Sequence, residues 1–444
     1  MQIKNVKRRY NKCLLMILLT LAFLLRLSFV LTLPNELHWP DEIDYDAMAR
    51  HLVATGEYDI TPRGPLYDFF LAGIYSVTGA HLIIIRLLQC LIDTASAFLV
   101  ISLARLFFRS SRVAWIAGAL YALYPFFIYF CGMLLSETLF IFLLLATVWS
   151  LASFQQTQKR GYQIAGGILL VLASLCRPVA LFLIIPLGFW NLMITQGTPA
   201  RKILSGLFFL FAASATLFPW TLRNYLLTGH FIPVSLGGGR SFWMGNSPET
   251  ILNGSVFFPK GLEEKLASIE VPIPIHLNYD YTESIPLREQ TPEIQRKTFG
   301  LTYERDQYLM KITLDYIKEK PGIFVTNMIK KLFLFWAPFS HLRANYRHGT
   351  TLHQWVGALS YLMLLIFSLI GLFQWSREKP RPDLSLLFVL IGSYVVGTAL
   401  FITIVRYRAP IDPYLILFAA IPLSKLPFFT STDKPPPGSV APRR

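Results

Sequence analysis

The sequence predicts an all-α polytopic membrane protein, from its composition and from the length of its apolar runs. Of its 444 residues, 54% are hydrophobic and only 15% are charged, whereas a soluble domain carries nearer a quarter charged residues. Apolar runs of about 20 residues recur, and each is long enough to cross a bilayer as a helix. An open sheet could not satisfy its backbone hydrogen bonds in lipid, so we expect helices rather than strands.

The formal net charge of +15 would suggest a nucleic-acid partner in a soluble protein. Here the basic residues lie mostly in short connections and at the termini, where the positive-inside rule accounts for them. We therefore expect no nucleic-acid partner. The four cysteines lie in apolar segments without zinc spacing or a disulfide framework, so we expect them to be packing residues.

The first apolar run, residues 13–33, follows a basic N-terminus. Basic residues beside a span favour the cytoplasmic side, which places the N-terminus inside. The run is too long for a signal peptide and no small-residue cleavage site follows it, so we expect an uncleaved membrane helix. The acidic loop 34–63 then lies outside.

The run 65–79 is about 15 residues long, which is short for a span. The next run, 81–108, ends in a cluster of arginines that favours the inside. One crossing between the acidic loop and this cluster meets that demand, and two do not. We therefore expect 65–79 to lie along the outer interface and 81–108 to cross.

Eight further crossings are expected, which gives about ten in all and places both termini in the cytoplasm. They are placed at about 113–131, 137–155, 162–176, 179–196, 203–223, 352–375, 383–404 and 409–427. The polar stretch 224–320 predicts a small, irregular extracytoplasmic element with helical character at 302–320. Residues 321–338 carry Lys330 and Lys331 near their middle, which suits an interfacial helix better than a span.

Six arginines lie at or near the predicted outer ends of helices, where the positive-inside rule disfavours them. They are Arg63, Arg86, Arg177, Arg223, Arg406 and Arg408. Each alone could snorkel to lipid headgroups or pair with a carboxylate. Together they favour an anionic ligand, because the forked donors of arginine suit phosphate.

Arg86 shares a helix face with Gln89 and Asp93, and such a polar stripe usually faces a bundle interior or a cavity. The alternative is that Arg86 pairs only with Asp93 or with an acid of the first loop. The sequence leaves both interpretations open.

The first outer loop concentrates acids, and two of them follow a proline as Pro40-Asp41-Glu42. This pattern is also a good helix start, because carboxylates favour the positive end of the helix dipole. The acid run continues past the first turn, however, and Asp41 shares a face with Tyr45. Ser136-Glu137 has the same ambiguity, since Ser136 could cap a helix and Glu137 could suit its dipole.

These residues together supply a water-facing carboxylate, a set of arginines and apolar surroundings. A carboxylate can take a proton from an attacking hydroxyl. Arginines can hold a departing phosphate and the charge that builds on it. Sugar transfer from a lipid-linked sugar phosphate needs both groups.

Six segments, in order along the chain, resemble the GT-C superfamily of membrane glycosyltransferases. The resemblance is greatest to its branch with polyprenol-phosphate-mannose protein mannosyltransferases, the lipid A aminoarabinose transferase and the Rgt-type transferases. Gly64 stands where this branch commonly has proline. The matching segments are Trp39-Pro-Asp-Glu-Ile-Asp-Tyr45, Arg63-Gly-Pro-Leu-Tyr67, Leu135-Ser-Glu-Thr-Leu139, Cys176-Arg-Pro178, the block from Pro219-Trp-Thr-Leu-Arg-Asn-Tyr225 through Trp243-Met-Gly-Asn246, and Arg406-Tyr-Arg-Ala-Pro410.

The resemblance implies an inverting transfer of a hexose or pentose from a polyprenyl-phosphate donor at the outer face of the inner (cytoplasmic) membrane. It implies that Asp41 is the general base, alone or with Glu42. The acceptor is a lipid, a polysaccharide or a protein, and the short outer region casts doubt on a protein. We assign substrate binding to Tyr45, Arg63, Tyr67, Arg86, Glu137, Arg177, Arg223, Asn224, Tyr225, Arg406, Tyr407 and Arg408.

Some members of the superfamily use a divalent metal and others do not, and the sequence leaves this open. His38 and His51 are possible ligands, with ordinary loop positions as the alternative. No cofactor is certain.

We divide the chain into four parts on this basis. Residues 1–223 form the catalytic transmembrane module with its acidic outer loop, and 224–350 form the extracytoplasmic region with an interfacial helix. Residues 351–430 hold the C-terminal transmembrane helices, and 431–444 form a basic cytoplasmic tail.

Two other functions compete with sugar transfer. A transporter or flippase of a lipid-linked sugar would use the outward arginines as a headgroup site, but it should also need polar groups deep in the membrane, and we find few beyond Asp93. A non-catalytic scaffold of an envelope-polysaccharide machine would not need the acid pair.

Overall fold

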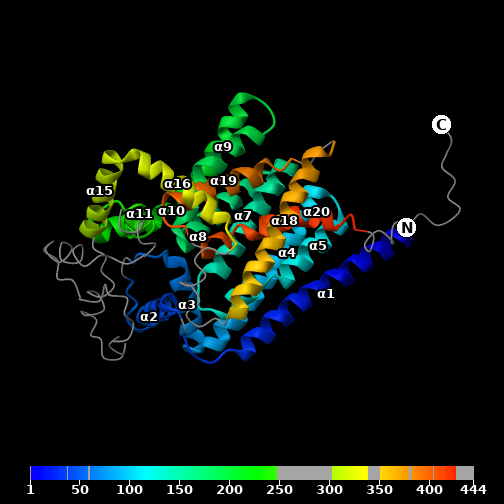
Figure 1. Cartoon of the computed structure of the whole chain (residues 1–444), viewed down its shortest axis with the longest axis horizontal. Coiled ribbons are helices and arrows are strands. Elements are labelled where there is room, and N and C mark those ends of the chain that lie inside the picture. The colour runs from blue at the N-terminus through cyan, green and yellow to red at the C-terminus, as the bar shows by residue number, and fades with distance from the viewer. Residues whose placement is uncertain are drawn as a thin grey trace.

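Every regular element that the structure describes is helical, which confirms the all-α class (Figure 1). The computed structural model describes residues 2–37, 39–58, 61–247, 303–338, 351–379, 383–403 and 405–426. Most of the predicted irregular outer element and the tail 431–444 lie outside these ranges. His38 and Asp59 also lie outside them.

Within the described residues, five helices are long and apolar enough to cross a membrane. Three of them, α1, α10 and α18, leave much of their apolar surface uncovered, as suits contact with lipid. The five are α1 (Gln2–Thr32), α4 (Leu82–Phe108), α7 (Glu137–Thr157), α10 (Pro199–Thr228) and α18 (Thr351–Arg377).

A sixth span results if α5 (Ser111–Leu123) and α6 (Pro125–Gly132) are counted together, with a bend of 48° between them. The break falls at Tyr124, directly before a proline, where the helical conformation is disfavoured. The remaining apolar helices are shorter: α8 (Arg160–Cys176), the consecutive η1 (Pro178–Leu183) and α9 (Ile184–Ile194), α19 (Ser385–Leu400) and α20 (Asp412–Leu423).

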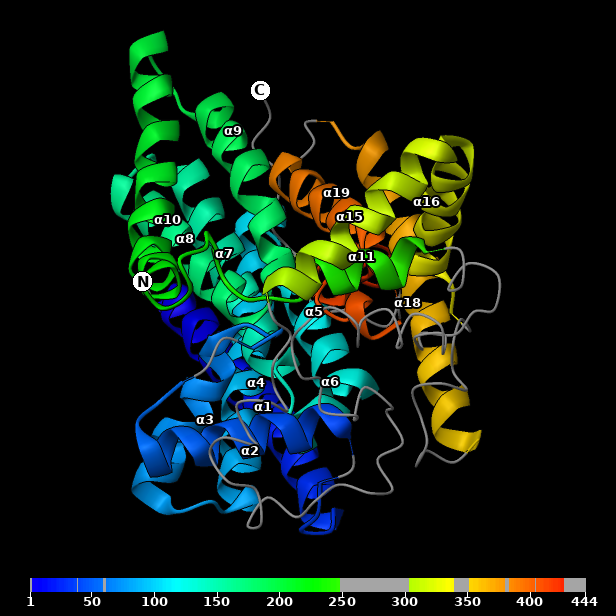
Figure 2. The same cartoon turned by 90° about the vertical axis from the view of Figure 1, so that its left-hand side faces the viewer.

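The acidic segment after α1 forms α2 (Pro40–Thr55), and the predicted interfacial segment after it forms α3 (Pro65–Thr78). Both helices lie crosswise to the long helices (Figure 2). Each begins with proline at its first position, where the missing N–H costs nothing. The chain leaves α2 at Gly56, whose left-handed φ of 72° suits glycine. The predicted segment 65–79 is therefore a helix, and it is not among the candidate spans.

Gly64 allows α3 to start directly against the end of α8. A Cβ at this position would collide with the backbone oxygens of Leu175 and Cys176. The glycine that departs from the usual proline is thus the residue that lets the acidic loop pack against the bundle. Arg63 and Arg177 are the chain neighbours of the two residues in contact, Gly64 and Cys176.

The helices predicted at 302–320 and 321–338 are present as α15 (Tyr303–Glu319) and α16 (Pro321–Trp336). α15 packs on α11 (Gly238–Asn246), and the Asp306 carboxylate accepts the backbone N–H groups of Gly239 and Arg240 at 3.0 and 2.9 Å. A carboxylate at a helix N-terminus satisfies donors that the helix leaves unpaired. The interfacial placement of α16 remains a prediction.

Candidate active site

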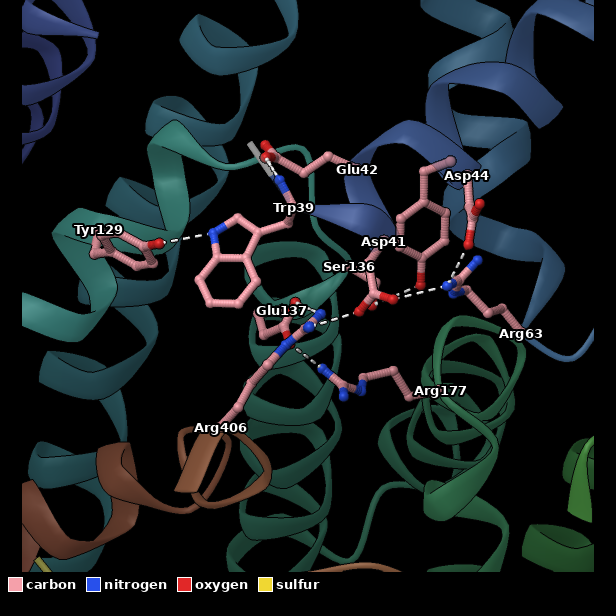
Figure 3. Close-up of polar contacts among 11 residues, drawn as sticks. Trp39, Asp41, Glu42, Asp44, Arg63, Tyr129, Ser136, Glu137, Arg177 and Arg406 are labelled. Carbon is pink, nitrogen blue, oxygen red and sulfur yellow. Dashed lines mark hydrogen bonds and ion pairs between the residues drawn. The ribbon is translucent and has the colours of Figure 1, made fainter. Parts of the chain in front are cut away.

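Asp41, in the first turn of α2, joins two arginines (Figure 3). Its Oδ1 accepts from Nη2 of Arg63 at 2.7 Å, and its Oδ2 accepts from Nη1 of Arg406 at 2.6 Å. Arg63 also pairs with Asp44, one turn further along α2, at 2.7 Å. The Asp41 side chain keeps 36% of its surface exposed, so it remains open to water.

Glu137, the first residue of α7, gathers two arginines from the other side. Arg406 reaches it through Nε and through Nη2, the latter at 3.1 Å, and Arg177 donates from Nη1 at 2.6 Å. The Glu137 side chain is fully buried. Arg406 therefore bridges an exposed carboxylate and a buried one, and we call Asp41, Asp44, Arg63, Glu137, Arg177 and Arg406 the arginine–carboxylate network.

Four helix ends bring the network together. Asp41 lies at the start of α2, Glu137 at the start of α7 and Arg177 directly after α8, while Arg406 lies in the short helix η4 (Val405–Arg408). Positions this far apart in the chain meet only through the packing of the bundle. Aromatic rings back two of the guanidinium groups, since Arg63 lies 5.1 Å from the ring centre of Tyr45 and Arg177 lies 5.1 Å from that of Tyr407.

The opposite charges of the network shift the pKa values of Asp41 and Arg63 away from the values that burial alone would give. Burial alone would raise the pKa of Asp41, but the guanidinium groups of Arg63 and Arg406 hold the pKa of this carboxyl well below its usual range. Burial would likewise lower the pKa of Arg63, and Asp41 and Asp44 raise it instead. Asp41 and Arg63 are therefore charged at neutral pH, and Asp41 in this arrangement is a weak base.

Glu42 lies beside Asp41 in sequence but points away from the network (Figure 3). Its carboxylate accepts the backbone N–H of Trp39 at 2.8 Å, as in a capping box, and that of Leu134 at 2.7 Å. The side chain is fully buried. In this structure Glu42 ties the start of α2 to the turn before α7, and a catalytic role for it stays a prediction.

The tyrosines Tyr45 and Tyr67 line the inner side of the same region. The Tyr45 hydroxyl donates to Ser136 at 3.2 Å, and the Tyr67 hydroxyl donates to Gln89 at 2.7 Å. Both rings are buried and meet edge to face. The Tyr45 ring also lies against the guanidinium of Arg63, so the two rings pack beside the network.

Arg86 does not pair with Asp93. Its guanidinium donates to the backbone oxygens of Pro34 and Glu36 at 2.8 and 3.1 Å, and the side chain is almost fully buried. Arg86 therefore anchors the chain between α1 and α2, and Asp93 pairs instead with Arg26.

The predicted block at 223–225 lies on the flank of the network. Arg223 reaches the backbone oxygen of Tyr58, and its guanidinium lies 4.8 Å from the ring centre of Trp220. Asn224 is buried and donates to the backbone oxygens of Ile232 and Val234. Half of the Tyr225 surface is exposed.

Arg408 leaves η4 in another direction from Arg406. It lies 3.5 Å from Asp412, over the ring of Tyr361, and donates to the backbone oxygen of Ala337 at 3.2 Å. Its neighbour Tyr407 accepts from the Tyr394 hydroxyl at its backbone oxygen, at 3.0 Å. Of the six outward arginines, the structure thus gathers Arg63, Arg177 and Arg406 in the network, and their role in binding stays a prediction.

The sequence did not assign Asp44 to the site, although its place in the acidic run was a signal. Asp44 shares Arg63 with Asp41. One turn apart on a helix, the two carboxylates lie on neighbouring faces and can hold one guanidinium between them.

The network does not suit a resident divalent metal. In the part of the chain that the structure describes, no group of three or more His, Cys, Asp or Glu side chains is placed to hold one. Both oxygens of Asp41 already face guanidinium groups. His51 makes its contacts with Thr55 in its own helix. We derive no catalytic step through a metal.

The fold and the site define a multi-pass helical membrane protein with a charged site where α7 begins and α8 ends. A family model described as dolichyl-phosphate-mannose-protein mannosyltransferase matches residues 62–221, which include Arg63, Glu137 and Arg177. No curated protein matches the sequence.

Solved structures of an archaeal oligosaccharyltransferase share the fold. The archaeal oligosaccharyltransferase AglB of Archaeoglobus fulgidus, in complex with an inhibitory peptide and dolichol-phosphate, is 14% identical with a TM-score of 0.55, covering 94% of this chain and 50% of that chain. Its apo form is 12% identical with a TM-score of 0.55, covering 94% and 51%. ArnT of Cupriavidus metallidurans bound to undecaprenyl phosphate is 15% identical with a TM-score of 0.43, covering 92% and 77%.

The chain spans about half the length of the archaeal oligosaccharyltransferase. At this level of identity, the structural similarity establishes the fold. The family model covers less than half of the chain, so residues 62–221 are similar to that family, and the whole chain is similar in fold to the archaeal transferase.

Proposed function

We propose that the protein transfers a sugar, with inversion, from a polyprenyl-phosphate donor to a hydroxyl group of a lipid, polysaccharide or protein acceptor. One observation carries the proposal: a water-exposed carboxylate, Asp41, lies 2.6 Å from Arg406, which belongs to a cluster of three arginines. A base and a phosphate-binding group are thus adjacent.

The reaction needs one proton acceptor and one anion-binding group. The acceptor oxygen attacks the anomeric carbon on the face opposite the phosphate, and Asp41 takes the hydroxyl proton. The bond between the anomeric carbon and the phosphate oxygen breaks, and its electron pair stays on the phosphate. Arg406 and Arg177 stabilise the added charge on the departing polyprenyl phosphate.

The donor class has support from the fold neighbours. The archaeal transferase was solved with dolichol-phosphate, a polyprenyl phosphate, and with a peptide. The three arginines of this chain suit the same phosphate chemistry. The acceptor stays open between lipid, polysaccharide and protein.

We further propose about ten crossings of the inner membrane, with both termini in the cytoplasm and the network at the outer face. The five long helices, the bent pair α5–α6 and the four shorter apolar segments would supply them. The basic residues of the N-terminus and of 377–381 support this orientation.

The test is the substitution Asp41→Asn, assayed for sugar transfer from a polyprenyl-phosphate donor by the purified protein in vesicles. Removing a general base should lower kcat by about 10²–10⁴-fold. The matched control is Asp46→Asn on the same helix, where Asp46 pairs with Arg50 and accepts from Tyr75, outside the network. If Asp41→Asn retains transfer at the rate of Asp46→Asn, Asp41 is not the base.

A further inference from the structure

Arg406 has two unequal carboxylate partners. Its contact with Asp41 is a single pairing at 2.6 Å to a side chain that is 36% exposed. Its contact with Glu137 uses two of its nitrogens, and the Glu137 side chain has no exposed surface. An incoming molecule can compete for the first contact and cannot reach the second.

The formal charge of the network leaves no cation to spare. Arg63, Arg177 and Arg406 carry three positive charges, and Asp41, Asp44 and Glu137 carry three negative charges. A phosphodiester donor adds one negative charge, so a guanidinium must leave a carboxylate to pair with it. Loss of the pairing at a buried carboxylate is far more costly than at an exposed one.

We propose that the donor phosphate takes Arg406 from Asp41 while Glu137 holds Arg406 and Arg177 in place. On this inference, which rests on the proposed function, Glu137 is a positioning residue that never touches the substrate. Donor binding itself then frees Asp41 to act as the base. The protein keeps a weak base until its donor is present.

The surrounding charges fix the direction of this coupling. Loss of one of two adjacent guanidinium groups raises the pKa of a carboxyl, toward the range in which it accepts protons effectively. The added phosphate charge acts in the same direction. The titratable and charged groups near the exchanging pair are Asp44, Tyr45, Arg63, Asp68, Glu137, Arg177 and Tyr407.

The decisive experiment measures the Kd of undecaprenyl phosphate for the full chain in detergent, without an acceptor. Asp41→Asn removes the competitor for Arg406, so this catalytically impaired variant should bind about three- to tenfold more tightly than the wild type. Glu137→Gln loses the charge that holds two arginines and should bind at least about tenfold more weakly. Asp46→Asn, with its own pairing to Arg50, should bind as the wild type does.

The outcomes separate this inference from the proposed function. If the wild type does not bind undecaprenyl phosphate, both are overturned. If the wild type binds and Asp41→Asn binds equally or more weakly, the exchange is wrong, and the assay of sugar transfer decides the proposed function separately. Unchanged binding by a folded Glu137→Gln removes the positioning role.

A second measurement needs no variant. The pH dependence of kcat/KM reports groups of the free enzyme, and that of kcat reports the bound complex. The exchange predicts that the acid limb of kcat lies at least about one pH unit above that of kcat/KM. Coincident limbs contradict it, even if the variants fail to fold.

Discussion

Two arginine–carboxylate clusters among the residues that the structure describes use the same chemistry in opposite ways. The first joins Arg26 of α1 to Asp93 of α4, with side chains that are 0% and 2% exposed. Nη1 of Arg26 donates to the backbone oxygens of Ala22 and Ala122 at 3.0 and 2.9 Å, and its Nη2 donates to that of Tyr121 at 3.3 Å. Asp93 also accepts from the Tyr121 hydroxyl at 2.6 Å. The second cluster is the network around Asp41.

The two clusters differ in how exposed they are to water and in whether a substrate can reach one of their charged groups. The Arg26–Asp93 pair is enclosed by α1, α4 and α5 and exposes no polar group that a substrate could reach. The network opens to water at Asp41, where an anion can enter. The Arg26–Asp93 pair has all its partners within the bundle, so it offers no binding site for a lipid headgroup. It therefore gives no support to the transporter alternative.

The largest expected effect breaks the first cluster. Arg26→Ala leaves Asp93 as an uncompensated buried charge, which should lower the stability of the folded protein by about 3–5 kcal/mol. The check is thermal unfolding of the purified protein in detergent, together with the yield of monodisperse protein.

The control restores neutrality without restoring the pair. Replacement of both partners by apolar residues, Arg26→Met with Asp93→Leu, should recover most of the lost stability, because apolar replacements of buried pairs are often tolerated. We expect the double variant to bind undecaprenyl phosphate and to transfer sugar normally. If the double variant folds but does not transfer sugar, the Arg26–Asp93 pair takes part in the active site. The proposed difference between the two clusters is then wrong.

The sequence predicted which arginines are unusual but could not separate the two clusters. Arg63, Arg177 and Arg406 converge as expected, whereas Arg86 anchors backbone oxygens. Position at a helix end shows that a charge is near the interface. Whether that charge meets the other charges of a site depends on the rotation of its helix and on side chains hundreds of residues away in the sequence. The periodicity of the sequence does not contain this information. Arg26 was missed because its apolar helix reads as a simple span.

The fold was more accessible to the sequence than the site was. The helices at 65–79, 302–320 and 321–338 were expected from length and charge, and each is present. The break at Tyr124, within the predicted crossing 113–131, was not expected although Pro125 was a visible signal. The count of ten crossings stays a prediction, because the shorter helices do not meet a bilayer's length by themselves.

The motif Trp243-Met-Gly-Asn246 was recognised from the sequence, but only the structure shows which backbone groups it contacts. Gly245 lies so close to the backbone of Phe401 that a Cβ would collide with it. The Asn246 side chain donates to the backbone oxygen of Leu400 at 2.9 Å, and Lys331 donates to that of Phe401 at 3.1 Å. These donors satisfy the C-terminal oxygens of α19 just before η4 and Arg406.

An intermediate effect is therefore expected for Asn246→Ala. The buried backbone oxygen of Leu400 loses its donor, which should cost about 1–3 kcal/mol of stability. Because this helix end positions Arg406, kcat should also fall. The control is Asn191→Ala, a buried asparagine that donates to Leu187 of its own helix and accepts from Gln163 of α8, neither of which belongs to the network. Equal losses of activity in the two variants would show that the end of α19 has no special link to the network.

The smallest expected effect concerns Asp68, a buried carboxyl near Arg63. Among the described residues, no arginine forms a hydrogen bond or ion pair with it. Burial raises its pKa to about 7, although the Tyr58 hydroxyl, which donates to it at 2.6 Å, and the charge of Arg63 both act in the lowering direction. A carboxyl with a raised folded-state pKa contributes stability below its unfolded pKa of about 3.8, and this contribution is lost as the pH rises through about 7.

The wild type should therefore lose about 1 kcal/mol of stability between about pH 6 and pH 7 relative to Asp68→Asn, which cannot ionise there, and the difference should level off above about pH 7. The check is the midpoint of thermal unfolding for both proteins across this range. Parallel pH profiles would mean that Asp68 is ionised throughout and shares the charged state of Asp41. A divergence that grows up to about pH 7 and levels off above it would instead show that this carboxyl stays protonated in the folded protein up to that pH.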